Sequence, residues 1–403
     1  MAEPVIKGPV IKGPVIKGWC PGALQPMLSG DGLVIRIRPD RGRLVPNQAA
    51  GIARLALAHG NGLIDLTSRA NIQVRGVTEA GYRPLIEGLA ALGGLIDGSR
   101  EDEARRNVIT SPFWSQGDGS HDLAAELANA LTGPDAPALP KKFGFAADCG
   151  LVPVLGAASA DIRLERGADG ALICRADGAT AGAKVTANTA AGAALQLARW
   201  FVQSGGIEGR RGRMAAHLAR GATLPEGFAE APAQQATSLS PRPGLVTVGT
   251  LVGFEFGQIH AETLLALAGF GALRVTPWRM LLIEGADSAP KLPGLISRHD
   301  DPMLRVVACT GAPGCLQAKQ PTRSLARDLA PHVPEGTILH VSGCAKGCAH
   351  PGPAFRTLTA QVHGFDVIRD GRAGDAAHRR CLAGEVLTGE LLAAHAASLF
   401  EAL

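Results

Sequence analysis

The sequence predicts an α+β protein built from two similar halves. Residues 32–94 follow the order strand, helix, strand, strand, helix, which is typical of a ferredoxin-like unit with an antiparallel sheet. Residues 246–285 repeat much of that order. The length of 403 residues suggests two or three domains at roughly 150 residues each. The chain therefore has room for α/β segments beside the two units.

The elements of the first unit follow from hydrophobic periodicity. Residues 32–39 alternate apolar and basic side chains, the pattern of a half-buried strand. Residues 46–59 have a proline near their start, an apolar face at helical spacing and a glycine after their end, which predicts a helix. Two further strands flank the turn at 67–69, and residues 80–94 form a second amphipathic helix.

The second half shows a weaker form of the same pattern. Residues 246–256 read as a strand, residues 260–271 as a helix, and residues 272–285 as two strands around a turn. Thr276 lies 209 residues after Thr67, which is about half the chain. This spacing suggests an internal duplication with pseudo-twofold symmetry. The alternative, that ordinary strand and helix patterns produced two similar pieces, remains open.

The organisation of the whole chain follows from these elements. PVIKG occurs three times in tandem within residues 1–18, and the proline and glycine of each repeat prevent a helix, so we expect a mobile tail. The other predicted segments are a first ferredoxin-like unit (19–98), an α/β lobe (99–222), a Pro/Ala/Gln/Ser-rich linker (223–243), a second ferredoxin-like unit (244–300) and a second α/β lobe (301–403). Within the first lobe we expect helices at 122–132 and 190–204 and strands near 146–154, 160–165 and 171–176.

The composition excludes several classes of protein. A net charge of +4 is too weak to indicate nucleic-acid binding, and 4% aromatic residues argue against base stacking. No run of apolar residues is long enough to span a membrane, and the N-terminus lacks the apolar core of a secretory signal. We expect a cytoplasmic protein, in which eight cysteines favour metal or redox chemistry over disulfides.

Four of the cysteines are clustered near the C-terminus. Cys309 and Cys315 enclose TGAPG, and after 28 intervening residues Cys344 and Cys348 enclose AKG. The glycine-rich loops allow backbone amides to turn toward sulfur, and thiolates select iron–sulfur clusters or zinc over hard cations. The spacing therefore favours a [4Fe–4S] cluster held by all four cysteines.

Zinc, disulfide bonds and simple burial are the alternatives to a cluster at these four cysteines. Structural zinc usually takes two to four residues between paired cysteines, which fits the five-residue loop poorly. A disulfide is disfavoured in this compartment, and burial of four thiols as small hydrophobes would not require paired spacing. We expect the remaining cysteines, which lack paired spacing, to be inert: Cys20, Cys149, Cys174 and Cys381.

The cysteine pattern resembles that of the siroheme-dependent sulfite and nitrite reductases, in which the last cysteine also bridges to the siroheme iron. Three other segments are similar to motifs of this family: TSRANIQVRG (67–76), RRNV (105–108) and LPKKF (139–143). The resemblance implies a duplicated nitrite/sulfite reductase-like fold, with Arg69, Arg106 and Lys142 facing the tetrapyrrole and the reacting centre. The second active-site lysine of the reductases is replaced by Gly144, which weakens the case for sulfite or nitrite as substrate.

These departures fit one branch of the superfamily. Four segments together resemble the precorrin-3B synthase family: WCPGALQPMLSGDGLVIRIRP, GNGLIDLTSRANIQ, KKFGFAADCG and HVSGCAKGCAHPGPA. The resemblance covers about residues 19–403. It implies an oxygen-dependent monooxygenase of cobalamin biosynthesis that hydroxylates precorrin-3A at the meso carbon between rings A and D, after which a ring-A acetate closes a γ-lactone.

The same resemblance implies the cofactors and partners. The family is associated with a [4Fe–4S] cluster and a mononuclear non-haem iron, whereas siroheme belongs only to the reductase alternative. Precorrin-3A and O2 would be the substrates. No GxGxxG segment follows a strand, so we expect an external electron donor, NADH-linked or ferredoxin-like. We expect a monomer, because a duplicated chain can form its own twofold cleft.

Precorrins carry many carboxylates, so a cleft for one should present arginine and lysine side chains. The candidate substrate-binding residues alternate along two strands and extend into the RRNV segment: Arg36, Arg38, Asn71, Gln73, Arg75 and Asn107. Positions 69, 71, 73 and 75 share one strand face, which we expect to be free for substrate, although such a face is more often simply solvated. Arg274 and Arg279 are the related candidates in the second unit.

The iron ligands are not readable from the sequence. Non-haem iron favours two histidines and a carboxylate, and His350, close to Cys348, is the first candidate, followed by His340 and His121. Cys348 itself is a further candidate for contact with the iron. Three functions compete at this point: a precorrin-3A monooxygenase, a siroheme sulfite or nitrite reductase, and a non-catalytic cluster- or zinc-binding scaffold.

Overall fold

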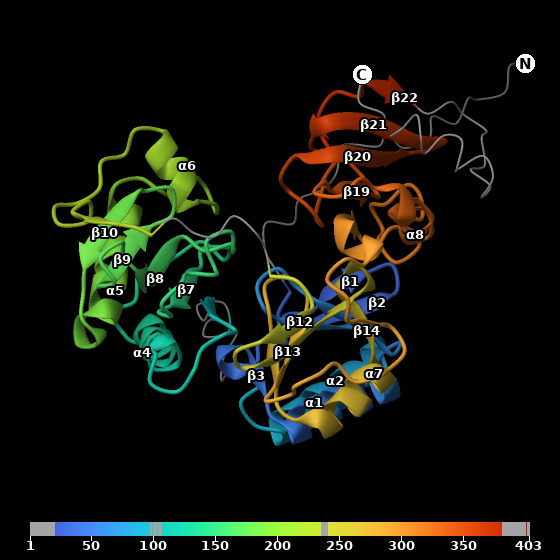
Figure 1. Ribbon diagram of the computed structural model, residues 1–403, viewed down its shortest axis with the longest axis horizontal. Coiled ribbons are helices and arrows are strands. Elements are labelled where there is room, and N and C mark those ends of the chain that lie inside the picture. The colour runs from blue at the N-terminus through green and yellow to red at the C-terminus, as the bar shows by residue number, and fades with distance from the viewer. Residues whose placement is uncertain are drawn as a thin grey trace, which may run out of the picture. The chain divides into compact units, whose positions relative to one another are not determined.

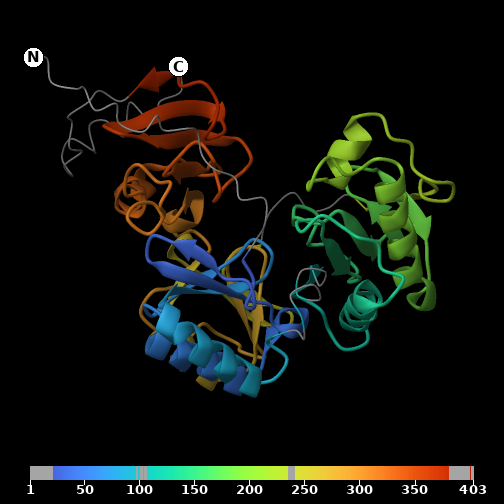
Figure 2. The same cartoon turned by 180° about the vertical axis from the view of Figure 1, so that it is seen from behind.

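The computed structural model describes residues 21–96, 99, 103, 107–234, 241–380 and 400, and shows an α+β protein (Figures 1 and 2). The chain forms two compact units, one ending at Asp301 and one beginning at Pro302. The PVIKG repeats and Arg106 lie outside the described residues. None of the helices in the described part of the chain is both long and apolar enough to cross a membrane.

Two antiparallel sheets, of five and six strands, form the centre of the first unit. The first sheet has the order β1 (Met27–Ser29), β2 (Gly32–Ile37), β5 (Ile72–Val77), β4 (Leu63–Leu66), β14 (Gln258–His260). The second has the order β12 (Gly244–Val246), β13 (Gly249–Phe254), β16 (Leu281–Glu284), β15 (Leu273–Val275), β3 (Arg43–Leu44), and β17 (Leu295–Ile296) also pairs with β13. Each half of the chain thus lends one edge strand to the sheet of the other half.

Helices α1 (Pro46–His59), α2 (Glu79–Ala91) and α7 (Ala261–Leu267) lie together on one side of these sheets (Figure 1). The predicted proline begins α1, and the Thr78 side chain caps α2 by accepting a hydrogen bond from Gly81 N at 3.0 Å. The apolar faces of the helices and sheets enclose one shared core, which includes Ile52 and Leu264. Burial of this core holds both halves together.

The turns between strands show that the two halves repeat one design. Thr67 Oγ1 accepts from Asn71 N at 3.1 Å, and Thr276 Oγ1 accepts from Met280 N at 3.3 Å. The residue before each donor has a left-handed backbone, with φ of 53° at Ala70 and 58° at Arg279. Such a match in turn geometry, together with the exchanged edge strands, confirms the duplicated ferredoxin-like architecture.

Each exchanged edge strand is also fixed by a polar network. Gln258 on β14 donates to Asp65 at 2.8 Å, and Asp65 pairs with Arg75 at 3.5 Å. In the other sheet Arg43 on β3 donates to Glu284 at 2.8 Å, and Arg274 donates to the same carboxylate at 2.6 Å. Thr67 and Thr276 are 209 residues apart, and the same spacing relates Asp65 to Arg274 and Arg75 to Glu284. Each half therefore has one ion pair at these two positions, with the acidic and basic residues exchanged.

The α/β lobe contains a six-stranded sheet with two parallel pairings. Its strands are β6 (Val108–Thr110), β7 (Phe145–Asp148), β8 (Ile162–Arg166), β9 (Leu172–Ala176), β10 (Ala181–Lys184) and β11 (Ala231–Pro232). Its helices are α4 (Ser120–Thr132), α5 (Ala187–Gln203) and α6 (Met214–Ala219). The range expected to be a linker, 223–243, contributes β11.

The predicted strand at 146–154 is wrong in its second half, because β7 ends at Asp148. The carboxylate of Asp148 accepts hydrogen bonds from Val154 N and Leu155 N, both at 2.6 Å. These bonds fold the chain back on itself, so the apolar residues after Asp148 form a loop.

Up to Arg380, the second unit contains five strands, of which β18, β19 and β20 run parallel. Its elements are η4 (Pro302–Arg305), β18 (Val306–Ala308), α8 (Arg323–Leu329), η5 (Ala330–His332), β19 (Leu339–Ser342), β20 (Ala354–Gln361), β21 (Gly364–Gly371) and β22 (Arg379–Arg380). The carboxyl ends of β18 and β19 lie at the same edge of this sheet.

The network at Glu284 predicts a pH-dependent contribution to stability. Burial raises the pKa of Glu284, but hydrogen bonds from Arg43 and Arg274 outweigh burial and hold it below its ordinary value of 4.5. We expect Glu284→Gln to lower the free energy of unfolding by about 2 kcal/mol near neutral pH, because two arginines lose their shared carboxylate. A group with a lowered pKa stabilises the fold above its ordinary pKa and loses that effect as pH falls through the folded value. The difference from wild type should therefore shrink below about pH 4.5.

Thermal unfolding followed by circular dichroism measures this difference. Glu87→Gln is the control, since Glu87 forms an exposed ion pair with Arg83 within α2 and should change stability by less than about 0.5 kcal/mol. Equal melting temperatures for both variants at neutral pH would contradict a stabilising role of Glu284.

Candidate functional site

The four clustered cysteines gather at one edge of the sheet in the second unit. Cys309 follows the end of β18 and Cys344 lies two residues after the end of β19, and these strands are parallel neighbours. Lys319 N donates to Gly343 O at 2.9 Å and thereby ties the two cysteine loops together. The second cysteine of each loop, Cys315 or Cys348, follows within a few residues.

The thiols of Cys309 and Cys315 lie close enough to act electrostatically on those of Cys344 and Cys348. Burial raises the pKa of Cys344 and of Cys348, and the thiols of Cys309 and Cys315 raise both further. Gly343 N donates to Cys309 Sγ at 3.1 Å. A sulfur that accepts a backbone hydrogen bond can also bind a metal through its other lone pairs.

This donor set fits a [4Fe–4S] cluster. In the described part of the chain, no three His, Cys, Asp or Glu side chains converge as ligands of one metal ion. A cubane cluster makes a different demand, because each of its four cysteines binds a different iron atom. Four thiols in neighbouring glycine-rich loops, with an amide directed at one sulfur, are the donors that such a cluster would use.

The remaining described cysteines fit the expectation of inert thiols. Cys149 and Cys174 are buried, and burial raises the pKa of each thiol to about 12. Such thiols are protonated at neutral pH and neither react nor bind metal readily. Cys20 and Cys381 lie outside the described residues.

The candidate iron-binding histidines lie in both units. His340 is fully buried on β19, and its ring centroid lies 5.6 Å from that of His350. His350 Nε2 lies 3.0 Å from the carbonyl oxygen of Pro353. His121 begins α4 in the first unit, 4.6 Å from the Trp114 ring. The described residues therefore do not provide two histidines and a carboxylate for a mononuclear iron.

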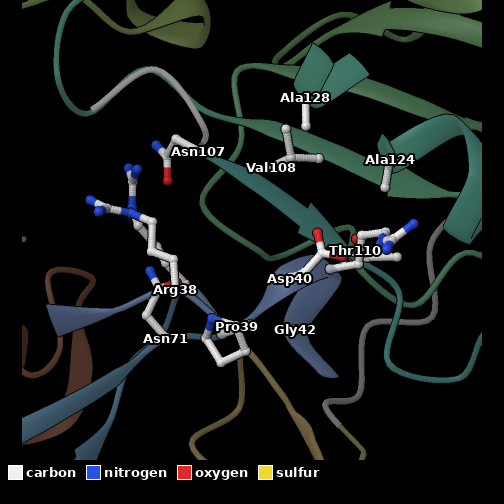
Figure 3. A pocket seen from close by; sticks show the side chains of 13 residues that line it. Arg38, Pro39, Asp40, Gly42, Asn71, Asn107, Val108, Thr110, Ala124 and Ala128 are labelled. Atoms are coloured by element: carbon white, nitrogen blue, oxygen red, sulfur yellow. Dashed lines mark hydrogen bonds and ion pairs between the residues drawn. The ribbon is translucent and has the colours of Figure 1, made fainter. Parts of the chain in front are cut away.

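A pocket of the first unit holds several of the predicted tetrapyrrole-facing residues. The hollow is partly open to solvent and has a cavity volume of about 30 Å³. It is lined by Arg38, Pro39, Asp40, Arg41, Gly42, Arg69, Ala70, Asn71, Asn107, Val108, Thr110, Ala124 and Ala128. Figure 3 shows Arg38, Asn71 and Asn107 near one end, with Asp40 and Thr110 together at the other. Alanines of α4 complete its apolar wall.

Arg69 connects this pocket to the LPKKF segment. Its Nη2 donates to Lys142 O at 2.7 Å and to Ser159 Oγ at 3.0 Å. Asn107 Nδ2 donates to Phe143 O at 2.8 Å. The three segments that carry the predicted catalytic residues therefore lie together, and the Lys142 side chain is exposed.

The other cations of the pocket have carboxylate partners. Arg38 pairs with Glu103 at 3.0 Å, and Arg41 pairs with Asp40. On the neighbouring strand pair, Gln73 accepts from Arg36 at 3.0 Å when its amide oxygen faces the guanidinium. Arg38 and Arg41 thus each have a carboxylate partner beside the pocket.

The polar strand face at 69, 71, 73 and 75, which was expected to be free, is partly occupied. Asn71 and Arg75 are buried. Arg75 pairs with Asp31 at 2.8 Å and with Asp65 at 3.5 Å. The alternation predicted which side chains share a face, but it could not show that the Arg75 guanidinium forms ion pairs with carboxylates of adjacent segments.

The candidate arginines of the second half, Arg274 and Arg279, lie at positions that support the fold. Arg274 is buried, donates to Pro112 O and Trp114 O at 2.9 and 2.6 Å, and lies over the Trp114 ring. Arg279 occupies the left-handed turn position. Neither arginine lines the pocket.

Sequence reasoning missed Ser159 and Arg213. Arg213 Nε donates to the buried Asp161 at 2.8 Å, and both Nη atoms lie 3.3 Å from Ser159 Oγ. The run GRRGR at 209–213 was the only sequence signal for this cation. Nothing in that run indicates that it meets Arg69, which lies far away in the chain.

Comparison with known proteins agrees with the sequence resemblance. Residues 25–92 match the nitrite/sulfite reductase ferredoxin-like half domain. Precorrin-3B synthase from Sinorhizobium sp. is 29% identical over 88% of this chain and 83% of its own length. The Mycobacterium tuberculosis NirA protein superposes with a TM-score of 0.58 at 18% identity, covering 83% of this chain and 74% of that one. The chain therefore has the nitrite/sulfite reductase-like fold and is similar to precorrin-3B synthase over most of its length.

Proposed function

We propose that this protein is an enzyme of cobalamin biosynthesis, a precorrin-3B synthase. It hydroxylates precorrin-3A at the meso carbon between rings A and D, and a ring-A acetate then closes a γ-lactone. The observation that carries the proposal is the arginine-lined pocket, found in a chain similar to precorrin-3B synthase. A cationic pocket suits a macrocycle with many carboxylates, because a guanidinium binds a carboxylate through two parallel hydrogen bonds.

Arg69 is the central substrate-binding residue of this proposal. It lines the pocket and donates to Lys142 O and to Ser159 Oγ, which fix its position there. Asn71 and Asn107 add amide groups to the lining of the pocket. Arg36, Arg38 and Gln73 lie on the strands that lead to it and extend the polar surface.

The residues proposed to act at the reacting centre are Arg69, Lys142 and Arg106. Arg69 donates to the backbone carbonyl of Lys142, which places this exposed residue beside Arg69, and the Lys142 side chain can supply a proton. Arg106 precedes Asn107 but lies outside the described residues, so its role stays a prediction. Together these groups stabilise negative charge that develops as oxygen is reduced.

Hydroxylation requires two electrons and two protons from outside, because one oxygen atom enters the substrate and the other leaves as water. A [4Fe–4S] cluster bound by Cys309, Cys315, Cys344 and Cys348 would supply electrons one at a time. The hydrogen bond from Gly343 N to Cys309 Sγ supports this binding by orienting the sulfur. The proposed donor is NADH-linked or ferredoxin-like. No step is assigned to a mononuclear iron, because the described residues do not assemble its ligands.

A siroheme sulfite or nitrite reductase is the second candidate, and the cysteine pattern and the fold favour it. Gly144 argues against it, since a Cβ at this position would lie 3.0 Å from Asn107 Nδ2 and 3.3 Å from Ser159 O. A lysine there would require Asn107 or the Ser159 backbone to move. The site is therefore built around glycine at the position where the reductases carry their second lysine.

An oxygen-labelling experiment tests the proposed reaction. Anaerobically purified protein, incubated with precorrin-3A, a reductant and labelled O2, should yield a lactone that has gained one labelled oxygen atom, detected by mass spectrometry. The absorption spectrum should show a broad iron–sulfur shoulder. Sharp siroheme bands with sulfite or nitrite reduction would instead identify a reductase, and stoichiometric zinc without colour would identify a scaffold.

Substitution of Arg69 tests the binding role of the pocket. Arg69→Ala should raise KM for precorrin-3A by about tenfold to a hundredfold, because a charge-assisted pair of about 1.5–3 kcal/mol is lost. Arg69→Lys should recover part of this loss, since it keeps the charge but not the fork. Arg54→Ala, which removes an exposed arginine of α1, is the control. Equal KM values for Arg69→Ala and Arg54→Ala would contradict the assignment.

Substitution of Cys344 tests the cluster. Cys344→Ser should abolish the iron–sulfur absorption and lower both iron and acid-labile sulfide, because a hard oxygen replaces a soft thiolate. Cys174→Ala, which removes a fully buried thiol elsewhere, should retain the full cluster. A complete cluster in the Cys344→Ser protein would remove the basis for electron transfer through this site.

A further inference from the structure

Thr110 has a buried hydroxyl that makes no hydrogen bond within the described part of the chain. The residue is only 4% exposed, and its Oγ1 is shielded from solvent. A buried hydroxyl is normally hydrogen-bonded, because leaving it unpaired costs free energy. Thr250, which is also buried, follows this rule and donates to Ala286 O at 2.8 Å. The Thr110 hydroxyl is therefore available to a ligand.

The alternation of side chains along β6 directs this hydroxyl toward the pocket. Ile109 packs into the core that the two halves share, whereas Val108 and Thr110, on the opposite face of the strand, line the pocket. Pairing with β7 fixes β6 at the edge of the lobe sheet. Figure 3 shows the Thr110 side chain beside Asp40.

Arg41 adds a second buried donor to the same lining. Its Nη2 pairs with Asp40, but its Nε is buried without a hydrogen-bond partner among the described residues. The backbone of Arg41 is left-handed, with φ of 49°, and the chain beyond it is fixed by the bond from Arg43 to Glu284 at 2.8 Å. A non-glycine residue is strained in this conformation, and such strain is concentrated at ligand-binding positions.

The chemistry of these two groups selects a hydrogen-bond acceptor. The N–H of a guanidinium can only donate, and a threonine hydroxyl can donate as well. The cavity volume of about 30 Å³ is about twice what one water-sized group needs. The two oxygen atoms of a carboxylate match this space. A tetrapyrrole ring is far larger, so only one of its side chains can enter through the open side of the pocket.

We propose that Thr110 and Arg41 bind one acetate or propionate carboxylate of the tetrapyrrole, while the ring lies across the opening of the pocket. This inference rests on the proposed function and deepens it, because it assigns two specificity-determining residues. Asp40 engages Nη2 of Arg41 and leaves Nε for the ligand. The equivalent turn position of the second half carries Phe256, which has no donor to offer.

Thr110→Val tests the site, because it removes the hydroxyl and keeps the shape of the side chain. The probe is uroporphyrin III, a porphyrin with acetate and propionate side chains, and its binding to the holoprotein is followed by fluorescence quenching. Thr110→Val should weaken binding about fivefold, which corresponds to about 1 kcal/mol, and Thr110→Ser should bind like wild type. The melting temperature of Thr110→Val should stay the same or rise, because burial of an unpaired hydroxyl destabilises a protein.

Thr250→Val is the matched control. It removes a buried hydroxyl that is bonded to Ala286 O, so it should lower the melting temperature and leave binding of uroporphyrin III unchanged. Arg41→Lys keeps the charge beside Asp40 but places a methylene where the buried Nε–H was, and it should also weaken binding about fivefold. The octamethyl ester of uroporphyrin III, which has no carboxylates, should bind equally to wild type and Thr110→Val.

The outcomes separate this inference from the proposed function. Wild-type affinity in both Thr110→Val and Arg41→Lys, or an equal loss of affinity for the acid and the ester, would overturn the carboxylate site and leave the precorrin-3B synthase proposal standing. Wild type that neither binds uroporphyrin III nor converts precorrin-3A would overturn both. Weakened binding of the acid in both variants, with unchanged binding in Thr250→Val, supports the site.

Discussion

The reciprocal exchange of edge strands is the constraint on which the first unit depends. Strand β14 completes the sheet of the first half and β3 completes that of the second, so neither sheet is finished without the other half of the chain. Polar networks at Asp65 and Glu284 fix the exchanged strands. The same strand β2 that leads to β3 also leads to the turn carrying Arg38 and Arg41. The pocket is therefore positioned by the exchange itself.

The α/β lobe contributes to the pocket through a few directed contacts. Arg274 donates to the carbonyls of Pro112 and Trp114, and Arg69 donates to Lys142 O and Ser159 Oγ. Each contact joins a guanidinium of the ferredoxin-like repeats to backbone or hydroxyl oxygen of the lobe. Because several such bonds converge, segments far apart in the sequence form one cationic surface.

The sequence predicted features that depend on neighbouring residues, and it did not predict contacts between segments that are far apart in the chain. Strand and helix periods are local, so the ferredoxin-like elements and the paired cysteine spacing were visible. The surroundings of Arg75 were not, because alternation assigns a face but not the carboxylates, Asp31 and Asp65, that reach it from other segments. The meeting of Arg213 with Arg69 depends on the packing of the whole lobe, for which no local pattern exists.

The two halves have diverged where the site is formed. Arg41 and Phe256 occupy equivalent left-handed turn positions, with φ of 49° and 57°, and Phe256 is buried. The spacing of 209 residues between Thr67 and Thr276 also relates Arg69 to Trp278. The ring of Trp278 stacks on that of Phe113, with 5.4 Å between the ring centroids. The two halves thus have similar backbones, but the second half has the aromatic residues Phe256 and Trp278 where the first half has Arg41 and Arg69. A polyanionic ligand therefore has a reason to bind the first half, and an asymmetric macrocycle can be bound in one orientation.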